Sequence, residues 1–394
     1  MDAPPRSSHR DFLRSQNHLA APHEITRSGD GGANAALGRP GGGMKTIVIM
    51  AGGTGGHIMP GLAVADELHR HGWKVVWMGN PGGMEARLVP ERGYAMAWVR
   101  FGALRGKGLL RKLLLPLSLL SGFVQAWRQF SRIRPDVVLG MGGFISFPGG
   151  MMAVLRGIPL VLHEQNSIAG LANRVLAGVA DRVLTGFPDV FKKGQWVGNP
   201  VRHAVAVLPA PTLRYGERSG KLNLLVLGGS LGAQVLNETL PPALALLPPD
   251  ERPAVVHQAG EKHIEALAAA YAAAGVEAHT TAFIEDMAGA YAWADLVICR
   301  AGALTIAELA AAGVASILVP FPHAVDDHQT ANARLLVHAG AAMLLPQKEL
   351  TAERLSLIRN LTRAQLLEMA DKARALALPE ATAAVAQACR EISK

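Results

Sequence analysis

The sequence is poor in cysteine and lacks the signature of a dinucleotide-binding site. Its 394 residues include only Cys299 and Cys389, which are too few to staple a fold and fit a reducing compartment. The spacing G-x-G-x-x-G does not occur, and the expected second strand, 74–80, ends without a carboxylate that could bind a ribose. Both absences argue against NAD or FAD, and no cofactor is expected.

Long uncharged runs and aromatic ladders are also missing. The uncharged run 113–127 is shorter than the about 20 residues that a membrane-spanning helix needs, and Pro116 interrupts it. No series of aromatic residues suited to base stacking accompanies the basic segment around this run. We therefore expect neither a membrane span nor nucleic-acid binding.

The positive charge is concentrated in one half of the chain. Residues 44–200 hold 18 Lys and Arg against 8 Asp and Glu, whereas residues 201–394 hold 16 against 19. This asymmetry indicates that one domain faces an anionic surface. Segment 104–127 mixes leucines with cations, which is typical of a segment in a membrane interface, although an ordinary buried helix can have the same pattern. The cations are Arg105, Lys107, Arg111 and Lys112.

Residues 1–43 differ from the rest of the chain. They are rich in Gly, Ser, Ala, Arg and His, and they contain no apolar core of a signal peptide. We expect a disordered N-terminal extension and a functional protein that begins at Met44, directly before the first strand.

An apolar strand runs directly into a glycine-rich loop in the stretch VIMAGGTGGHIMPGLAVADEL, residues 48–68. Pro60 suits the first turn of the helix that follows. A strand, a glycine turn and a helix N-terminus together form an anion site, typically for phosphate; the alternative is a tight turn without a ligand. The loop glycines are Gly52, Gly53, Gly55 and Gly56.

The same organisation occurs twice. After a hinge at 198–205, a new strand at 221–229 enters a second glycine loop, GGSLGA, where Ser230 can also meet a phosphate oxygen unless the loop is a bare turn. We therefore predict an α/β protein with two Rossmann-like, doubly wound domains facing a cleft. The expected limits are 44–201 and 202–377, with a terminal helix of about 378–394 packing back on the first domain. Other strands are expected near 46–50, 74–78, 94–99, 137–139, 159–162, 182–184, 254–257, 279–282, 296–299 and 316–319.

Two stretches of the second half carry polar groups. In CRAGALTIAEL, 299–309, a helix follows a strand, and Glu308 near its start is either a partner of the helix dipole or an acceptor for two ribose hydroxyls. The proline-bounded loop VPFPHAVDDHQTANA, 319–333, suits a sugar better than a metal, because its polar residues have no fixed helical ligand spacing. They are His323, Asp326, Asp327, His328 and Gln329.

Seven motifs follow one another from about Met44 to the C-terminus: AGGTGGHIMPGLAVADEL, GMGGFISFPGG, HEQNSIAGLANR, VGNPVR, GGSLGAQVLNE, RAGALTIAEL and PFPHAVDDHQTANA. Together they closely resemble the MurG family of UDP-N-acetylglucosamine transferases. The resemblance implies the GT-B glycosyltransferase fold, with UDP-GlcNAc held mainly by the second domain. The first domain would hold undecaprenyl-diphosphate-linked MurNAc-pentapeptide, peripherally at the cytoplasmic face of the bacterial inner membrane.

The resemblance also implies roles for individual residues. Glu308 falls where the family holds the ribose, and Ile284 where a backbone amide and carbonyl contact uracil. His328 departs from the pattern, since some members have a second glutamine there. Acceptor-side candidates are Gly52, Gly53, Glu164 and Asn173. Donor contacts are expected at Thr54, Gly55, Gly56, Asn166, Arg202, Ser230, Ile284, Ala303, Leu304, Thr305, Ile306, Ala307, Glu308 and Gln329.

His57, after the first glycine loop, is the expected general base, because the pKa of an imidazole is close to neutral; the alternative is a histidine that caps the loop. It would take the proton of the muramyl 4-OH as that oxygen attacks C1 of GlcNAc, with inversion. No D-x-D occurs, so no metal is expected. The remaining alternatives are another UDP-sugar transferase acting on a lipid such as diacylglycerol, a UDP-GlcNAc 2-epimerase, and a non-catalytic nucleotide sensor docked on a membrane.

Overall fold

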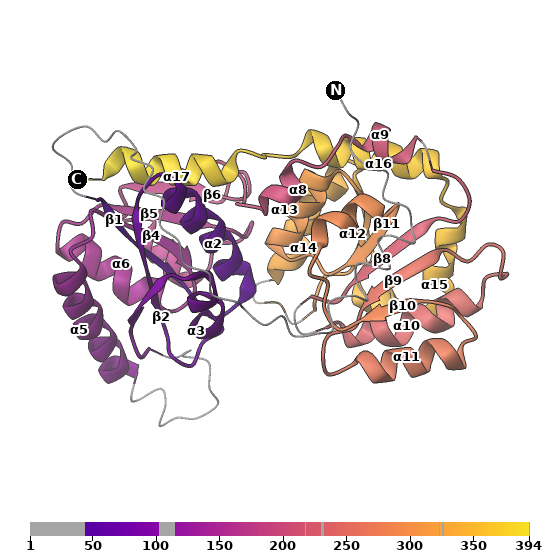
Figure 1. Ribbon diagram of the computed structural model, residues 1–394, viewed down its shortest axis with the longest axis horizontal. Coiled ribbons are helices and arrows are strands. Elements are labelled where there is room, and N and C mark those ends of the chain that lie inside the picture. Colours follow the sequence, from indigo (N-terminus) through magenta and orange to yellow (C-terminus); the bar gives the residue numbers. More distant parts are fainter. Residues whose placement is uncertain are drawn as a thin grey trace, which may run out of the picture.

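The computed structural model describes residues 44–101, 115–216, 218–229, 232–322, 324 and 327–393. They form two α/β domains that lie side by side, each built on one parallel sheet (Figure 1). The prediction of two doubly wound α/β domains is therefore confirmed. The N-terminal extension, the four cations of segment 104–127 and Ser230 lie outside the described residues.

The N-terminal domain contains a seven-stranded sheet with the order β3-β2-β1-β4-β5-β6-β7. Its strands are mainly apolar because helices cover both faces of a parallel sheet. Along the first strand, Ile47 and Ile49 face one layer of helices, and Val48 and Met50 face the other. The strands are β1 (Thr46–Ala51), β2 (Lys74–Gly79), β3 (Ala95–Trp98), β4 (Val137–Gly142), β5 (Leu160–Glu164), β6 (Arg182–Thr185) and β7 (Gln195–Trp196).

Two layers of helices enclose this sheet. One layer contains α2 and α3, and the other contains α5, α6 and α7. The bounds are α2 (Gly55–Arg70), α3 (Glu85–Leu88), α5 (Leu115–Ile133), α6 (Ser146–Leu155) and α7 (Leu171–Leu176), with a 3-10 turn at Pro90–Arg92.

The C-terminal domain contains a six-stranded sheet with the order β10-β9-β8-β11-β12-β13. Both sheets thus have their first strand in the middle, and the order reverses between β1 and β4 and between β8 and β11. Open α/β sheets bind ligands beside this reversal, at the carboxyl ends of the strands. The strands are β8 (Asn223–Leu227), β9 (Ala254–Gln258), β10 (His279–Thr281), β11 (Leu296–Cys299), β12 (Ala315–Leu318) and β13 (Ala342–Leu344).

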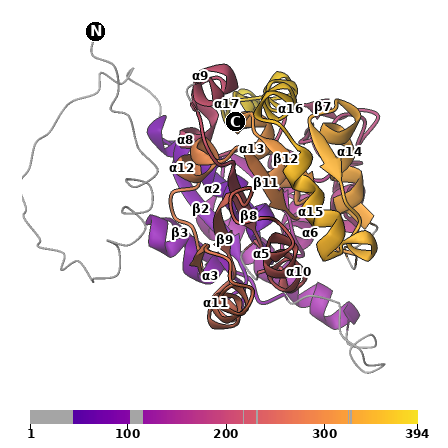
Figure 2. The same cartoon turned by 90° about the vertical axis from the view of Figure 1, so that its right-hand side faces the viewer.

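Helices cover both faces of the second sheet as well. Figures 1 and 2 show α12 and α13 on one side of it and α10 and α11 on the other. The bounds are α8 (His203–Ala206), α9 (Pro211–Tyr215), α10 (Gln234–Ala245), α11 (Ile264–Ala273), α12 (Met287–Trp293), α13 (Ala303–Ala312), α14 (His328–His338), α15 (Ala352–Ser356) and α16 (Arg363–Ala375), with 3-10 turns at Gln347–Glu349 and Leu357–Asn360.

The last helix, α17 (Ala381–Ile392), returns to the N-terminal domain and packs on α2, as the yellow helix along the top of Figure 1 shows. Val385 and Cys389 are completely buried in the core of that domain. The chain therefore crosses between the domains twice. The two crossings touch, because a Cβ atom at Gly198 would lie 2.7 Å from Cβ of Leu378.

Candidate active site

The loops after β1 and β4 pack against each other at the reversal point of the N-terminal sheet. Gly142 and Gly143 have φ angles of +99° and +83°, and a Cβ atom at Gly143 would lie 2.3 Å from the carbonyl oxygen of Gly52. The hydroxyl of Ser146 accepts the N–H of Gly142 at 3.1 Å and donates to the carbonyl of Met50 at 3.0 Å. Glycine is needed here because two backbones meet.

A buried carboxylate that no sequence pattern indicated lies inside the first glycine loop. Glu85 is 1% exposed and accepts the N–H groups of Gly53 at 3.2 Å and Asn80 at 3.0 Å. Nothing in its sequence context, GGMEARL, distinguishes it from a surface glutamate. Helix α2 has no side-chain cap among the described residues, so the N–H groups of Gly55 and Gly56 are the ones left to face a ligand.

His57 lies in the first turn of α2 and is partly buried. Its Nδ1 atom is 2.9 Å from Oε1 of Gln165, which follows β5. Helix α2 also contacts α13 of the other domain. His57 therefore lies where the two domains meet, at the helix N-terminus that follows the glycine loop.

Glu164, at the end of β5, organises the loop beyond this strand. It is 2% exposed, and its Oε1 accepts the backbone N–H of Asn166 at 2.9 Å. Its Oε2 accepts the side-chain amide of Asn173 at 2.8 Å and the N–H of Gly170 at 3.2 Å. The structure thus brings together the two acceptor-side candidates Glu164 and Asn173, but it uses both oxygens of Glu164 inside the loop.

Glu308, in the second turn of α13, is the most polar group of the second domain's site. It is 5% exposed, and Oε2 accepts the hydroxyl of Tyr291 at 3.2 Å. Nε of Arg202 approaches Oε1 at 3.5 Å, yet Oε1 has no hydrogen-bond partner among the described residues. Burial raises the pKa of Glu308, opposed by Arg202 and the Tyr291 bond. A buried carboxylate oxygen without a partner is suited to accept hydroxyl groups of a ligand.

Helix α13 begins at Ala303 after Gly302, which supplies no side-chain cap. The N–H groups of Ala303, Leu304 and Thr305 have no acceptor within the helix and are suited to an anion. Ile306 differs from these expected donor contacts, because its side chain is completely buried in the core and its N–H donates to Gly302. Of the predicted stretch, the structure therefore presents mainly the first turn and Glu308.

Gln329 and Asn332 lie three residues apart on α14. Oε1 of Gln329 accepts the backbone N–H of Phe321 at 2.9 Å, which leaves its NH2 group without a partner in the described part of the chain. Asn332, missed by the sequence analysis, is completely buried and joins the domains. It accepts the N–H of Ser167 at 2.9 Å and donates to Oδ1 of Asn166 at 3.3 Å. Its spacing from Gln329 in QTANA was the available signal.

The described part of the second glycine loop also packs closely against a neighbouring backbone, like the first loop. Gly232 has a φ angle of +76°, and a Cβ atom there would lie 2.2 Å from the carbonyl oxygen of Ala259. Ile284 has a buried side chain, and its backbone N–H and carbonyl group make no hydrogen bond to other described residues. These two backbone groups are available for the edge of a base.

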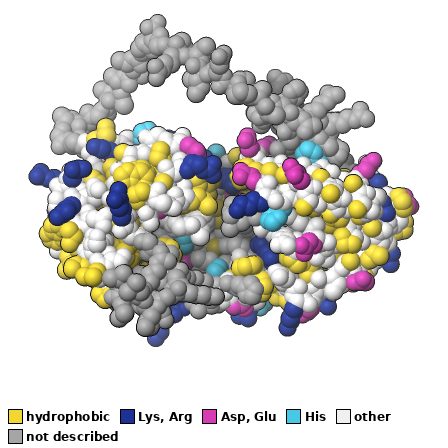
Figure 3. Space-filling model, turned by 90° about the horizontal axis from the view of Figure 1, so that it is seen from below, with side chains coloured by type: hydrophobic (Ala, Val, Ile, Leu, Met, Phe, Trp, Pro, Cys, Tyr) yellow, Lys and Arg dark blue, Asp and Glu magenta, His cyan; other side chains and the backbone are white. Residues whose placement is uncertain are grey.

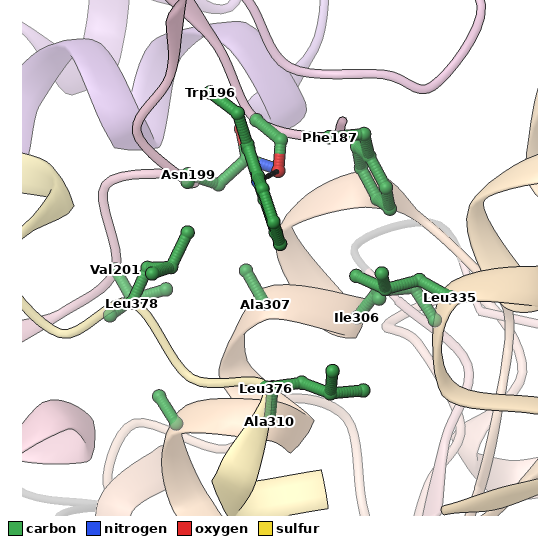
Figure 4. A pocket seen from close by; sticks show the side chains of 13 residues that line it. Phe187, Trp196, Asn199, Val201, Ile306, Ala307, Ala310, Leu335, Leu376 and Leu378 are labelled. Atoms are coloured by element: carbon green, nitrogen blue, oxygen red, sulfur yellow. Dashed lines mark hydrogen bonds between the residues drawn. The ribbon is translucent and has the colours of Figure 1, made fainter. Parts of the chain in front are cut away.

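A small apolar pocket lies at the hinge between the domains (Figure 4). Its volume is about 30 Å³, which is too small for a nucleotide or a sugar. The indole of Trp196 donates to the carbonyl of Gly186 at 3.2 Å beside it. Ile306 and Ala307, two of the expected donor contacts, line this pocket together with Phe187, Asn199, Val201, Ala310, Leu335, Leu376 and Leu378.

Comparison with known proteins agrees with this geometry. The glycosyltransferase family 28 N-terminal domain matches residues 47–185, and the glycosyltransferase family 28 C-terminal domain matches residues 223–388. The crystal structure of Acinetobacter baumannii MurG has a TM-score of 0.77 and 42% sequence identity, and the match covers 88% of this chain and 99% of that one.

Two curated relatives carry the name UDP-N-acetylglucosamine–N-acetylmuramyl-(pentapeptide) pyrophosphoryl-undecaprenol N-acetylglucosamine transferase. The protein of Dechloromonas aromatica is 71% identical over 350 residues, which cover 89% of this chain and 99% of the relative. The protein of Azoarcus sp. is 70% identical over 352 residues, with the same coverage of 89% and 99%. The chain therefore belongs to glycosyltransferase family 28, in the MurG family of that group.

Proposed function

We propose that this chain transfers GlcNAc from UDP-GlcNAc to the 4-OH of undecaprenyl-diphosphate-linked MurNAc-pentapeptide (lipid I), which forms lipid II for peptidoglycan synthesis. The observation that carries this choice of substrates is the 71% identity to a relative whose name states the transfer. The site supports it, since one domain offers a partly buried imidazole and the other a buried carboxylate with a free oxygen.

The donor is assigned to the C-terminal domain. Oε1 of Glu308 accepts the ribose hydroxyls, and the backbone of Ile284 contacts the edge of uracil. The N–H groups at the start of α13 face the diphosphate, because they are unpaired and the helix dipole favours an anion. The free NH2 group of Gln329 is placed for a hydroxyl of the sugar. Arg202 lies beside Glu308 at 3.5 Å and stabilises charge on the departing UDP.

The chemistry is a single displacement with His57 as base. The imidazole accepts the proton of the muramyl 4-OH while that oxygen forms a bond to C1 of GlcNAc. The bond from C1 to the UDP oxygen breaks at the same time, so the α linkage becomes β and UDP leaves with the electron pair. Preorganised N–H groups at the helix start stabilise the new negative charge.

A radiolabel-transfer assay tests this reaction. Labelled UDP-GlcNAc and lipid-linked MurNAc-pentapeptide should give a labelled lipid, and EDTA should leave the rate unchanged because no step needs a metal. Omission of the acceptor should abolish the release of UDP. Conversion of UDP-GlcNAc to a second UDP-sugar, or its hydrolysis to UDP and a free sugar, without acceptor would favour an epimerase, and labelling of diacylglycerol in place of the muramyl lipid would favour another lipid transferase.

We further propose that the N-terminal domain docks peripherally on an anionic bilayer. Leu117, Leu120, Val124 and Trp127 are 65%, 59%, 41% and 44% exposed, and their spacing places them on one face of α5. The guanidinium of Arg156 lies 4.6 Å above the ring of Trp127. No helix in the described part of the chain is long and apolar enough to cross a membrane.

The distribution of positive charge also supports docking through this face of the N-terminal domain. Arg128 and Arg132 are exposed on α5, and Figure 3 shows basic and apolar side chains together on the left, over the N-terminal domain. A water-soluble nucleotide donor and a polyprenyl acceptor meet at a membrane surface, and we infer that this surface is the cytoplasmic face of the bacterial inner membrane. The basic residues of 104–112 would add to it.

Vesicle sedimentation separates the apolar and the charged contributions. Changing Leu120 and Trp127 to Ser should lower binding to anionic and neutral vesicles alike. Changing Arg128 and Arg132 to Gln should remove about 2 kcal/mol, or roughly 30-fold, on phosphatidylglycerol vesicles only. Leu213 and Leu246, which are 71% and 53% exposed on the other domain, provide matched Leu→Ser controls. Unchanged partition of the α5 variants would place the membrane face elsewhere.

A further inference from the structure

A chain of hydrogen bonds connects the hinge to His57. Nε2 of His163 lies 2.9 Å from the carbonyl oxygen of Gly198, and Nδ1 of the same ring lies 3.0 Å from Nε2 of Gln165. Oε1 of Gln165 lies 2.9 Å from Nδ1 of His57. His163 and Gln165 are 0% and 1% exposed, so bulk water does not compete for these groups.

Each hydrogen bond in this series has only one possible donor and one possible acceptor. A carbonyl oxygen only accepts, so His163 donates from Nε2 to Gly198. Burial lowers the pKa of His163 to about 4, and its neutral ring therefore has a lone pair on Nδ1 near pH 7. Gln165 must donate to that lone pair through its Nε2–H group.

A second contact fixes the same orientation of the Gln165 amide. Its Nε2 also lies 3.1 Å from the backbone carbonyl oxygen of His163, which accepts only. The amide oxygen is consequently the atom that faces His57. Since this oxygen has no hydrogen to give, the bond requires the proton of His57 to be on Nδ1.

We infer that His163 and Gln165 are positioning residues that hold His57 as the Nδ1–H tautomer, with the lone pair on Nε2 for the acceptor hydroxyl. The inference rests on the proposed role of His57 as base. Gly142 packs against the Nδ1 edge of the His57 ring, because a Cβ atom at this glycine would lie 2.8 Å from Nδ1 of His57. Nε2 of His57 has no partner among the described residues, so its lone pair is available to the acceptor hydroxyl. A base whose other ring nitrogen is held by a neighbouring acceptor is the arrangement that general-base catalysis needs.

The test combines kinetics with the ¹⁵N NMR spectrum of histidine-labelled full-length protein. Gln165→Leu removes the acceptor, and we expect kcat to fall roughly 10–100-fold, a part of the 10²–10⁴-fold contribution of a general base, with little change in the KM for UDP-GlcNAc. The His57 signals should shift away from the Nδ1–H pattern of the parent. Gln165→Glu keeps an oxygen facing His57 and should keep the Nδ1–H tautomer, but its second oxygen faces the lone pair of His163, so kcat should stay below that of the parent. Gln195→Leu, an exposed position on β7, is the matched control.

Different failures have different signatures. A parent spectrum with the proton of His57 on Nε2 overturns the inference. It is also overturned if Gln165→Leu keeps kcat within twofold while His57→Ala is inactive, and the proposed function then stands without the positioning pair. If His57→Ala keeps full activity, the proposed base is wrong and the pair has no base to orient.

Discussion

Substitution of Glu308 separates the binding of UDP from the stability of the fold. Oε1 has no hydrogen-bond partner among the described residues, while Oε2 already accepts from Tyr291. If Oε1 accepts ribose hydroxyls, Glu308→Ala removes hydrogen bonds to a charged group, which contribute about 1.5–3 kcal/mol. Calorimetry with UDP should then show an affinity about 10–100-fold lower.

The unliganded protein should respond in the opposite way to Glu308→Gln. Burial raises the pKa of Glu308 above its ordinary value, so the folded state binds this proton more tightly than the unfolded state does. The charged carboxylate therefore destabilises the folded protein at pH above the raised pKa, and this penalty disappears as the pH falls below the unfolded pKa. Glu308→Gln should raise the melting temperature at pH 8, and the gain should shrink toward pH 5.

One control variant serves both the calorimetry with UDP and the measurement of melting temperature. Glu265→Gln, an exposed position on α11, should change neither the UDP affinity nor the melting temperature. Unchanged UDP affinity in Glu308→Ala would refute a contact with the ribose. A Glu308→Gln protein less stable than the parent at pH 8 would show that the contact with Arg202 outweighs the cost of burial.

Three further substitutions test other parts of the molecule. His57→Ala should lower kcat by roughly 10²–10⁴-fold while calorimetry shows unchanged UDP affinity; turnover within a few-fold of the parent would make His57 a structural cap. Asn332→Leu removes hydrogen bonds between the domains and should raise the KM for UDP-GlcNAc about tenfold, with a more open shape in small-angle scattering. Asp295 is completely buried between Arg218 and Arg363. Asp295→Asn should therefore lower the free energy of unfolding, measured in urea, by about 3 kcal/mol, whereas the exposed control Asp371→Asn should leave it unchanged.

Local patterns were sufficient to predict the architecture. Apolar runs such as 46–50 and the glycines after them are dictated by the covered parallel sheet and by close backbone contacts, so they are visible in sequence. Strands β7 and β13 were not predicted; they are two and three residues long and lie at the edges of the sheets. Length and edge position alone do not explain this, because β10 is an edge strand of three residues and was predicted near 279–282.

The site was predictable in outline but not in its polar partners. Glu85 and Gln165 act through residues distant in sequence, and no spacing rule distinguishes them from ordinary polar positions. For Asn332, the spacing from Gln329 was the one signal, and it does not show the contact with the other domain. For Glu308 the sequence allowed two interpretations, because its place near a helix start suggested a partner of the helix dipole as well as a ribose contact. Helix α13 begins at Ala303, so Glu308 lies in the second turn, where Tyr291 and Arg202 surround it. The assigned contacts with UDP-GlcNAc and lipid I remain predictions.

The hinge connects both halves of the proposed machinery through adjacent residues. The carbonyl of Gly198 anchors His163 at 2.9 Å, and four residues later Arg202 lies 3.5 Å from Glu308. A rotation of one domain against the other about this segment would therefore change the support of the proposed base and the surroundings of Glu308 together. Asn332 also joins the domains, through Ser167 and Asn166. A donor that binds one arrangement of the domains more tightly than the others would also favour one arrangement of the proposed base, because neighbouring hinge residues contact both.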